Sequence, residues 1–164
     1  MKIKPLLKSD LAEAITVIKA SFETYVKPSW SQNAIEAFYT KDIAIDKLKS
    51  LLDSDNICLK CTVDDCISGV LLFSSKRKLA YLFVSPEENG KGIAKKLFDA
   101  AKLQVDDSVD YIELASTEYA VPVYEKLGFR KSANAFLYND CTFQPMVYWM
   151  GNYRLNSSVQ IIES

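Results

Sequence analysis

A strand, a glycine turn and an amphipathic helix follow one another directly in this chain, and this succession constrains the fold most. Leu79 to Val84 is nearly all apolar, which predicts a strand buried on both faces. Pro86 ends that strand, because proline cannot donate a ladder hydrogen bond. Gly90 and Gly92 form the turn, and residues 92–103 then repeat apolar side chains at helical spacing. A buried strand that leads into a helix is typical of α/β folds.

The remaining elements follow from changes in the hydrophobic period. Apolar residues at helical spacing predict helices over residues 11–25, 30–39, 42–52 and 118–127. Alternating or apolar runs predict strands over residues 2–7, 57–63, 67–73 and 111–115, from 129 onward and over 142–150. We therefore predict an α/β fold in which a mixed central sheet of roughly six to seven strands is flanked by about four helices. Residues 1–150 form a single domain, and the tail over 151–164 has too weak a pattern to assign.

The composition excludes several classes of function. The formal net charge of -1 argues against a general nucleic-acid-binding protein, which needs a clustered basic surface. The chain contains no histidine, so Ser-His-Asp catalysis, Cys-His catalysis and histidine metal sites are excluded. Any chemistry must use carboxylate, hydroxyl, thiol, amine or backbone groups.

The cysteines and the N-terminus predict a cytoplasmic protein with reduced thiols. Residues 1–10 lack the apolar core of a secretory signal, and no run approaches the ~18 apolar residues of a membrane span. Cys58 and Cys61 have the spacing of a metal or redox pair. Residues 57–63 alternate as a strand, however, and residues three apart on a strand point to opposite faces. We therefore predict no metal site and no membrane contact.

The glycine turn is a candidate anion site. The first amide groups of a helix have no partner within it and carry a partial positive charge. Two glycines allow the backbone to approach a large anion closely, so phosphate oxygens suit this position. Lys91, Lys95 and Lys96 add positive charge nearby. The alternative is a glycine-rich connection that binds no ligand.

Two common glycine motifs do not match this turn. The nucleoside-triphosphate loop requires Gly-x-x-x-x-Gly-Lys-Ser/Thr, which the chain lacks. The dinucleotide fingerprint requires Gly-x-Gly-x-x-Gly, but Lys95 stands at its last position.

The turn Asn89-Gly90-Lys91-Gly92-Ile93-Ala94 instead resembles the GNAT acetyltransferase superfamily, whose pattern Gln/Arg-x-x-Gly-x-Gly/Ala follows a strand. Asparagine replaces glutamine or arginine at the first position. About 35 residues further on, Ala120-Val121-Pro122-Val123-Tyr124-Glu125-Lys126-Leu127-Gly128-Phe129 resembles the second signature, Ala-x-x-x-Tyr-Glu-Lys-Leu-Gly-Phe. The hairpin around Ile67-Ser68-Gly69-Val70 is similar to the family's central strands. The resemblance covers residues 2–150 and implies a GNAT-like sheet that splays apart at the cofactor site.

The resemblance implies a protein that uses acetyl-CoA as its co-substrate. The CoA pyrophosphate would lie on the amides of the turn, and the pantetheine arm would pair with the preceding strand like an added strand. Thr117 matches a position that is often asparagine, where a side chain contacts pantetheine. The implied cofactor-binding residues are Leu82, Phe83, Val84, Asn89, Gly90, Lys91, Gly92, Ile93, Ala94, Lys95 and Thr117.

The resemblance also implies catalytic roles. Tyr124 matches the tyrosine that the family commonly uses as the general acid that protonates the CoA thiolate. The alternative for Tyr124 is a core aromatic. Some members use a glutamate on the strand before the turn as the base, and this chain has none there. Glu113 on the neighbouring strand is one candidate base, and a water relay is equally possible.

The implied activity is transfer of an acetyl group to a primary amine of a small molecule or peptide by direct attack. The first helices offer Phe22, Tyr25 and Trp30 for the acceptor, and these aromatics suit an amine with an apolar body. Their alternative role is to fill the core. A non-catalytic acyl-CoA-binding or regulatory module of the same fold remains the alternative function. A homodimer is possible, but the sequence identifies neither an interface nor the acceptor amine.

Overall fold

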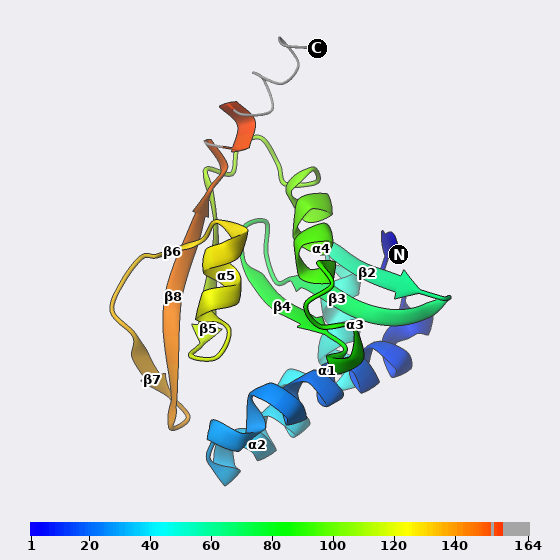
Figure 1. The fold of residues 1–164 in the computed structure, drawn as a ribbon, viewed down its shortest axis with the longest axis vertical. Coiled ribbons are helices and arrows are strands. Elements are labelled where there is room, and N and C mark those ends of the chain that lie inside the picture. Colours follow the sequence, from blue (N-terminus) through cyan, green and yellow to red (C-terminus); the bar gives the residue numbers. More distant parts are fainter. Residues whose placement is uncertain (152, 156–164) are drawn as a thin grey trace.

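The computed structural model describes residues 1–151 and 153–155, which fold into two four-stranded sheets (Figure 1). The first sheet has the order β1-β2-β3-β4, and all of its neighbouring strands are antiparallel. Its strands are β1 (Lys2–Pro5), β2 (Cys58–Val63), β3 (Cys66–Phe73) and β4 (Leu79–Val84). In the second sheet β8 pairs with each of the other three strands. These strands are β5 (Tyr111–Thr117), β6 (Arg130–Lys131), β7 (Phe136–Tyr138) and β8 (Cys141–Trp149).

Helical segments connect the strands and cover the first sheet. The α-helices are α1 (Leu11–Tyr25), α2 (Gln32–Ala37), α3 (Ile45–Asp53), α4 (Ile93–Lys102) and α5 (Val121–Leu127). A π-helix, η3 (Phe38–Asp42), continues α2. Single turns of 3₁₀-helix are η1 (Lys8–Asp10), η2 (Lys27–Ser29) and η4 (Pro86–Glu88).

The α/β class is confirmed, but the prediction of one mixed sheet of six to seven strands with about four helices is wrong. The described residues form two sheets rather than one, and more than four helices. The two sheets approach each other at β4 and β5. These strands share no continuous ladder there, since the contact is an isolated parallel bridge between Lys78 and Glu113. There the Glu113 amide donates to the Arg77 carbonyl at 2.8 Å. Beyond this point the two strands form no further ladder, which agrees with a splayed arrangement.

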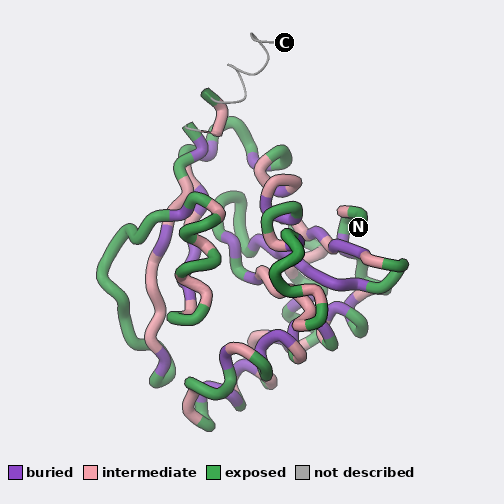
Figure 2. The backbone as a smooth tube through the Cα atoms, viewed as in Figure 1, coloured by how far each residue is buried: buried purple, intermediate pink, exposed green. Residues whose placement is uncertain are grey.

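The first sheet has a hydrophobic core on each face. One cluster joins β2 and β3 to α4, and the other joins β3 and β4 to α1 and α3. Figure 2 shows that β3, which lies between these clusters, is buried along nearly its whole length. Cys61 belongs to the α4 side and Cys58 packs against the α1 side, so their predicted orientation to opposite faces is confirmed. Both are free thiols.

Helix α4 lies very close to β3 at Gly69. A Cβ atom built on Gly69 would come within 2.6 Å of the Ile93 side chain and 3.1 Å of the Leu97 side chain. Real Cβ atoms do not approach other atoms so closely, so glycine at this position lets α4 pack against the sheet. This packing fixes where the N-terminus of α4 stands.

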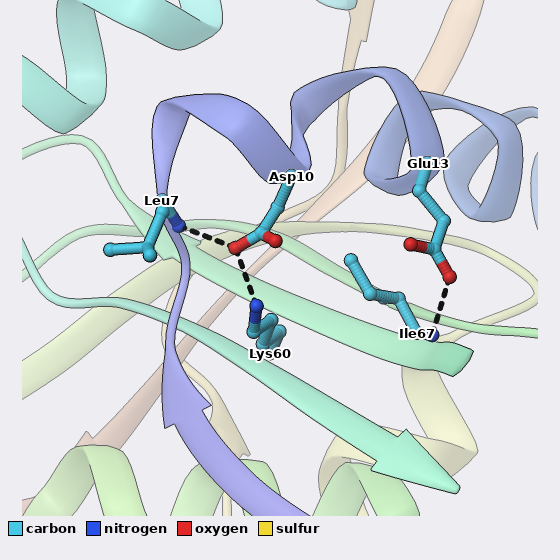
Figure 3. Close-up of polar contacts among 5 residues, drawn as sticks. All are labelled: Leu7, Asp10, Glu13, Lys60 and Ile67. Atoms are coloured by element: carbon cyan, nitrogen blue, oxygen red, sulfur yellow. Dashed lines mark hydrogen bonds and ion pairs between the residues drawn. The ribbon is translucent and has the colours of Figure 1, made fainter. Parts of the chain in front are cut away.

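The start of α1 is tied to the first sheet by two carboxylates (Figure 3). Asp10 accepts a hydrogen bond from the Leu7 amide at 2.8 Å and forms an ion pair with Lys60 at 2.6 Å. Glu13 accepts a hydrogen bond from the Ile67 amide at 2.7 Å. These bonds orient the helix that carries Phe22 and Tyr25.

Several predicted boundaries shift. Helix α5 begins at Val121 rather than Glu118, because Pro122 fits only the first turn of a helix, where no amide partner is needed. Gly128 ends it in the left-handed region with φ of 102°. Ile45, at the start of α3, is 45% exposed. Of the tail that the sequence left unassigned, residues 152 and 156–164 lie outside the described residues. Within the described part, none of the helices is both long and apolar enough to cross a membrane.

Candidate active site

The turn before α4 has the backbone shape that an anion site requires. Gly90 and Gly92 adopt φ angles of 80° and 85°, in the left-handed region that glycine enters without strain. Nothing lies within 4 Å of a Cβ atom built on either glycine, so the turn is open on that side. Gly92 is also the N-cap of α4.

The first turn of α4 leaves backbone donors available. The first helical bond runs from the Lys96 amide to the Gly92 carbonyl at 3.0 Å, so the amides of Ile93, Ala94 and Lys95 have no partner inside the helix. No acidic residue lies in this turn of α4. The partial positive charge at the helix start is therefore uncompensated by a side chain of α4 itself, which suits a phosphate.

The lysines near the turn are mostly engaged in exposed ion pairs. Lys91 lies 3.1 Å from Glu88, and Lys95 lies 2.5 Å from Asp99. Both lysine side chains are more than half exposed, so these pairs are weak and a phosphate could compete for either ammonium group.

Two adjoining cavities occupy the region where β4 and β5 diverge. The larger has a volume of about 420 Å³ and the smaller about 80 Å³. Leu82, Val84, Asn89 and Ala94 all line the smaller cavity, which thus begins at the glycine turn. Both cavities are lined by Ser21, Tyr25, Leu82, Tyr119, Ala120 and Tyr124. The path from the turn therefore leads directly into the larger cavity.

Tyr124 lies on the border between the two cavities. It is half-buried on α5, and its ring contacts Phe129 edge-on with 5.6 Å between centroids. Burial raises the pKa of the Tyr124 phenol well above its usual value. The phenol therefore keeps its proton at neutral pH and can act as a donor at this border.

The larger cavity brings together the predicted acceptor residues Phe22, Tyr25 and Trp30. Phe22 is buried and stacks on Phe38 with 3.9 Å between centroids. Trp30 contacts Phe22 at 5.3 Å and, on the second sheet, Phe143 at 5.9 Å, both edge-on. The cavity thus has aromatic walls from both sheets.

Of the other site residues predicted from the sequence, some line a cavity and one does not. Phe83 and Thr117 line the larger cavity, and the Thr117 hydroxyl accepts a bond from the Ala120 amide at 3.4 Å. Glu113, the candidate base, is not among the residues that line either cavity. Its carboxylate lies 3.7 Å from the Arg77 guanidinium, beside the bridge to β4.

Sequence reasoning missed several residues that line the cavities. Tyr119 stacks on Tyr25 with 5.0 Å between centroids and an interplanar angle of 10°. Asp42, Lys47 and Lys78 also line the larger cavity. No sequence signal connects these residues, because Asp42 and Lys47 precede β2, Lys78 precedes β4 and Tyr119 follows β5.

The comparisons with known proteins show the family of this chain. The family model of the acetyltransferase (GNAT) domain matches residues 26–149. An uncharacterized N-acetyltransferase YitH of Bacillus subtilis is 30% identical over 80 residues, which are 49% of this chain and 28% of that protein.

Solved structures of low sequence identity share the fold. A GCN5-related N-acetyltransferase from Rhodopseudomonas palustris has a TM-score of 0.79 at 18% identity, and the match covers 90% of this chain and 94% of that one. The PaiA N-acetyltransferase from Thermoplasma acidophilum, solved in complex with coenzyme A, has a TM-score of 0.75 at 22% identity, covering 90% and 98%.

Proposed function

This chain belongs to the GNAT acetyltransferase family, and we propose on that basis that it transfers an acetyl group from acetyl-CoA to a primary amine. The observation that carries the proposal is the border position of Tyr124, between a cavity that starts at an anion-binding turn and a larger aromatic cavity. The coenzyme A complex of the related fold supports the same co-substrate.

The proposed binding mode assigns each part of acetyl-CoA to a group of residues. The pyrophosphate accepts hydrogen bonds from the amides at the start of α4, between Gly90 and Lys95. The pantetheine arm runs along the edge of β4 at Leu82 to Val84, which faces β5 and has no strand partner there. The thioester then lies near Tyr124, with the acceptor amine arriving from the larger cavity.

The proposed reaction is direct attack of a neutral amine on the thioester carbonyl carbon. The carbon–nitrogen bond forms, the carbon–sulfur bond breaks, and the departing CoA thiolate receives the phenolic proton of Tyr124. The amine nitrogen loses its extra proton to water, because no glutamate lines the cavity and the only carboxylate among its described lining residues, Asp42, is paired with Lys47. Tyr124 then regains a proton from solvent.

The larger cavity supports an acceptor with an apolar body. Phe22, Trp30 and Phe143 form flat walls on which such a body can pack, and their rings also attract a cation. We further propose a cytoplasmic location, which is supported by four free thiols, since cytosolic cysteines stay reduced. A homodimer remains a proposal that light scattering can test.

The test of the activity is CoA release from acetyl-CoA in the presence of a panel of primary amines. Release that depends on the amine, together with mass-spectrometric detection of the N-acetylated product, would support the proposal. Tight CoA binding in calorimetry without acetylation of any amine would instead favour a non-catalytic acyl-CoA-binding module. Absence of CoA binding would remove the proposed site altogether.

A further inference from the structure

The end of the larger cavity remote from the glycine turn is basic. Lys47 on α3, Lys78 and Ser74 line this cavity, and Lys78 just before β4 stands at the opposite end of that strand from the turn. Asp42 is the single carboxylate among the described lining residues, and its Oδ1 lies 3.5 Å from the Lys47 ammonium. Lys78 forms no ion pair with any described residue. This end of the cavity therefore carries a net positive charge.

The groups around Lys47 keep it charged. The Tyr81 hydroxyl donates to the Asp42 main-chain carbonyl at 2.7 Å, which holds Tyr81 and the end of η3 together beside the lysine. Burial alone lowers the pKa of Lys47, but Tyr81 and Asp42 outweigh it and raise this pKa. Lys47 is therefore a cation at every pH at which the enzyme would work.

The position of Lys78, just before β4, sets how long a ligand must be to reach this end of the cavity. A strand rises about 3.3 Å per residue, so Lys78 lies ~13 Å along the backbone from Leu82, where the two cavities adjoin. Lys78 is exposed and also lines the cavity. A ligand that occupied the aromatic middle of the cavity would then present its far end to Lys78 and Lys47.

We propose that the acceptor is a monoamine with a flat, apolar body whose far end is an anionic group held by Lys47, Lys78 and Ser74. This inference rests on the proposed function and narrows its acceptor class. A second ammonium group at the basic end would be repelled by two lysines and would find one carboxylate that is already paired. Polycationic amines are therefore poor acceptors, and an anionic end is what distinguishes good ones.

A matched series of three acceptors tests the charge without changing the shape. 4-(Aminomethyl)benzoate carries the anion, 4-(aminomethyl)benzamide is its neutral counterpart, and 1,4-bis(aminomethyl)benzene places a cation at the same position. We expect kcat/KM to fall in that order. The acid should exceed the amide about fivefold, because partly exposed charge pairs each contribute little binding free energy. Equal values, or a preference for the diamine, would overturn the inference.

Lysine variants show whether the preference comes from this end of the cavity. Lys78→Gln and Lys47→Gln should each reduce the ratio of kcat/KM between the acid and the amide. Their controls are Lys76→Gln and Lys49→Gln, which change an exposed lysine in the same loop and on the same helix but outside the cavity lining. A ratio unchanged in both cavity variants would contradict the assignment.

The two proposals fail in different ways. If all three amines are acetylated equally well, the activity stands and the anionic acceptor falls. If none is acetylated, the wider panel of primary amines decides the activity, and binding of the three compounds to the CoA-loaded protein, measured by calorimetry, decides the acceptor class alone. Tighter binding of the acid that is lost in Lys78→Gln supports the inference, and equal binding overturns it.

Discussion

The side-chain amide of Asn89 donates a hydrogen bond to the phenol oxygen of Tyr25 at 3.0 Å. Asn89 stands at the start of the glycine turn, and Tyr25 ends α1. The ring of Tyr25 also stacks on Tyr119, in the connection between β5 and α5. Tyr25 thus links the turn, the first helix and the second sheet at the point where the two cavities adjoin, and it helps to hold the turn in place.

Tyr25→Phe should raise the KM for acetyl-CoA about two- to fivefold, because an exposed neutral hydrogen bond contributes about 1 kcal/mol or less. The ring remains, so the stacking on Tyr119 should survive. Steady-state kinetics with acetyl-CoA as the varied substrate measures the change. Tyr119→Phe is the matched control, since it keeps the stacked pair and the bond to Asn89, and its KM should not change. Equal KM values in all three proteins would show that the bond does not position the turn.

Features with a local cause could be predicted from the sequence. The glycine turn and the amphipathic pattern that follows Gly92 place the start of α4 within one residue of its observed position. The alternation around Cys58 and Cys61 puts their side chains on opposite faces, because a strand has a period of two wherever it pairs. These signals lie within one element each, so tertiary structure has little scope to change them.

Features with a non-local cause could not be predicted. The division into two sheets depends on where the pairing between β4 and β5 ends. The hydrophobic pattern of the sequence does not predict the isolated bridge between Lys78 and Glu113. Asn89 and Tyr25 are 64 residues apart, so their bond depends on packing of the whole fold. For the same reason Glu113 could be chosen as a candidate base from its strand face alone, although its carboxylate lies beside Arg77 and the residue lines neither cavity.

Gly92→Asp should weaken CoA binding at least tenfold relative to Gly92→Asn. Both side chains tolerate the left-handed backbone conformation of Gly92, and they have nearly the same shape. The difference between them is one negative charge placed beside the proposed pyrophosphate site, and repulsion of about 1.4 kcal/mol or more corresponds to that factor. Isothermal titration calorimetry with CoA gives both dissociation constants. Equal constants would mean that the pyrophosphate lies elsewhere.

Asp10→Asn should lower the free energy of unfolding by about 2 kcal/mol at pH 7, because the nearly buried ammonium of Lys60 loses its partner. Burial alone would raise the pKa of Asp10, but the hydrogen bonds from Lys60 and the Leu7 amide outweigh it and lower this pKa. Stability from a lowered carboxyl pKa is complete above the unfolded value of about 3.9 and disappears as the pH falls through the folded value.

The difference between wild type and Asp10→Asn in urea unfolding should therefore persist from pH 7 to about pH 5 and shrink below pH 4. Asp53→Asn is the control, since Asp53 pairs with Lys8 at the surface with both side chains more than half exposed. Its effect should be below about 0.5 kcal/mol at each pH. A difference for Asp10→Asn that stays constant down to pH 3 would show that the charge of Asp10 is not what stabilises the start of α1 (Figure 3).

Tyr124→Phe should lower kcat by roughly 10²-fold or more and leave the dissociation constant of CoA unchanged, because the phenol acts on the departing thiolate rather than on the bound thioester. The pKa of Tyr124 is raised, so the phenol stays protonated and wild-type kcat should not decline between about pH 7 and pH 9. Tyr119→Phe removes another cavity phenol and should keep kcat within about twofold, which separates a general loss of polarity from the loss of the proton donor. An unaltered kcat in Tyr124→Phe would remove this residue from the proposed mechanism, while equal losses in both variants would assign the effect to the cavity surface.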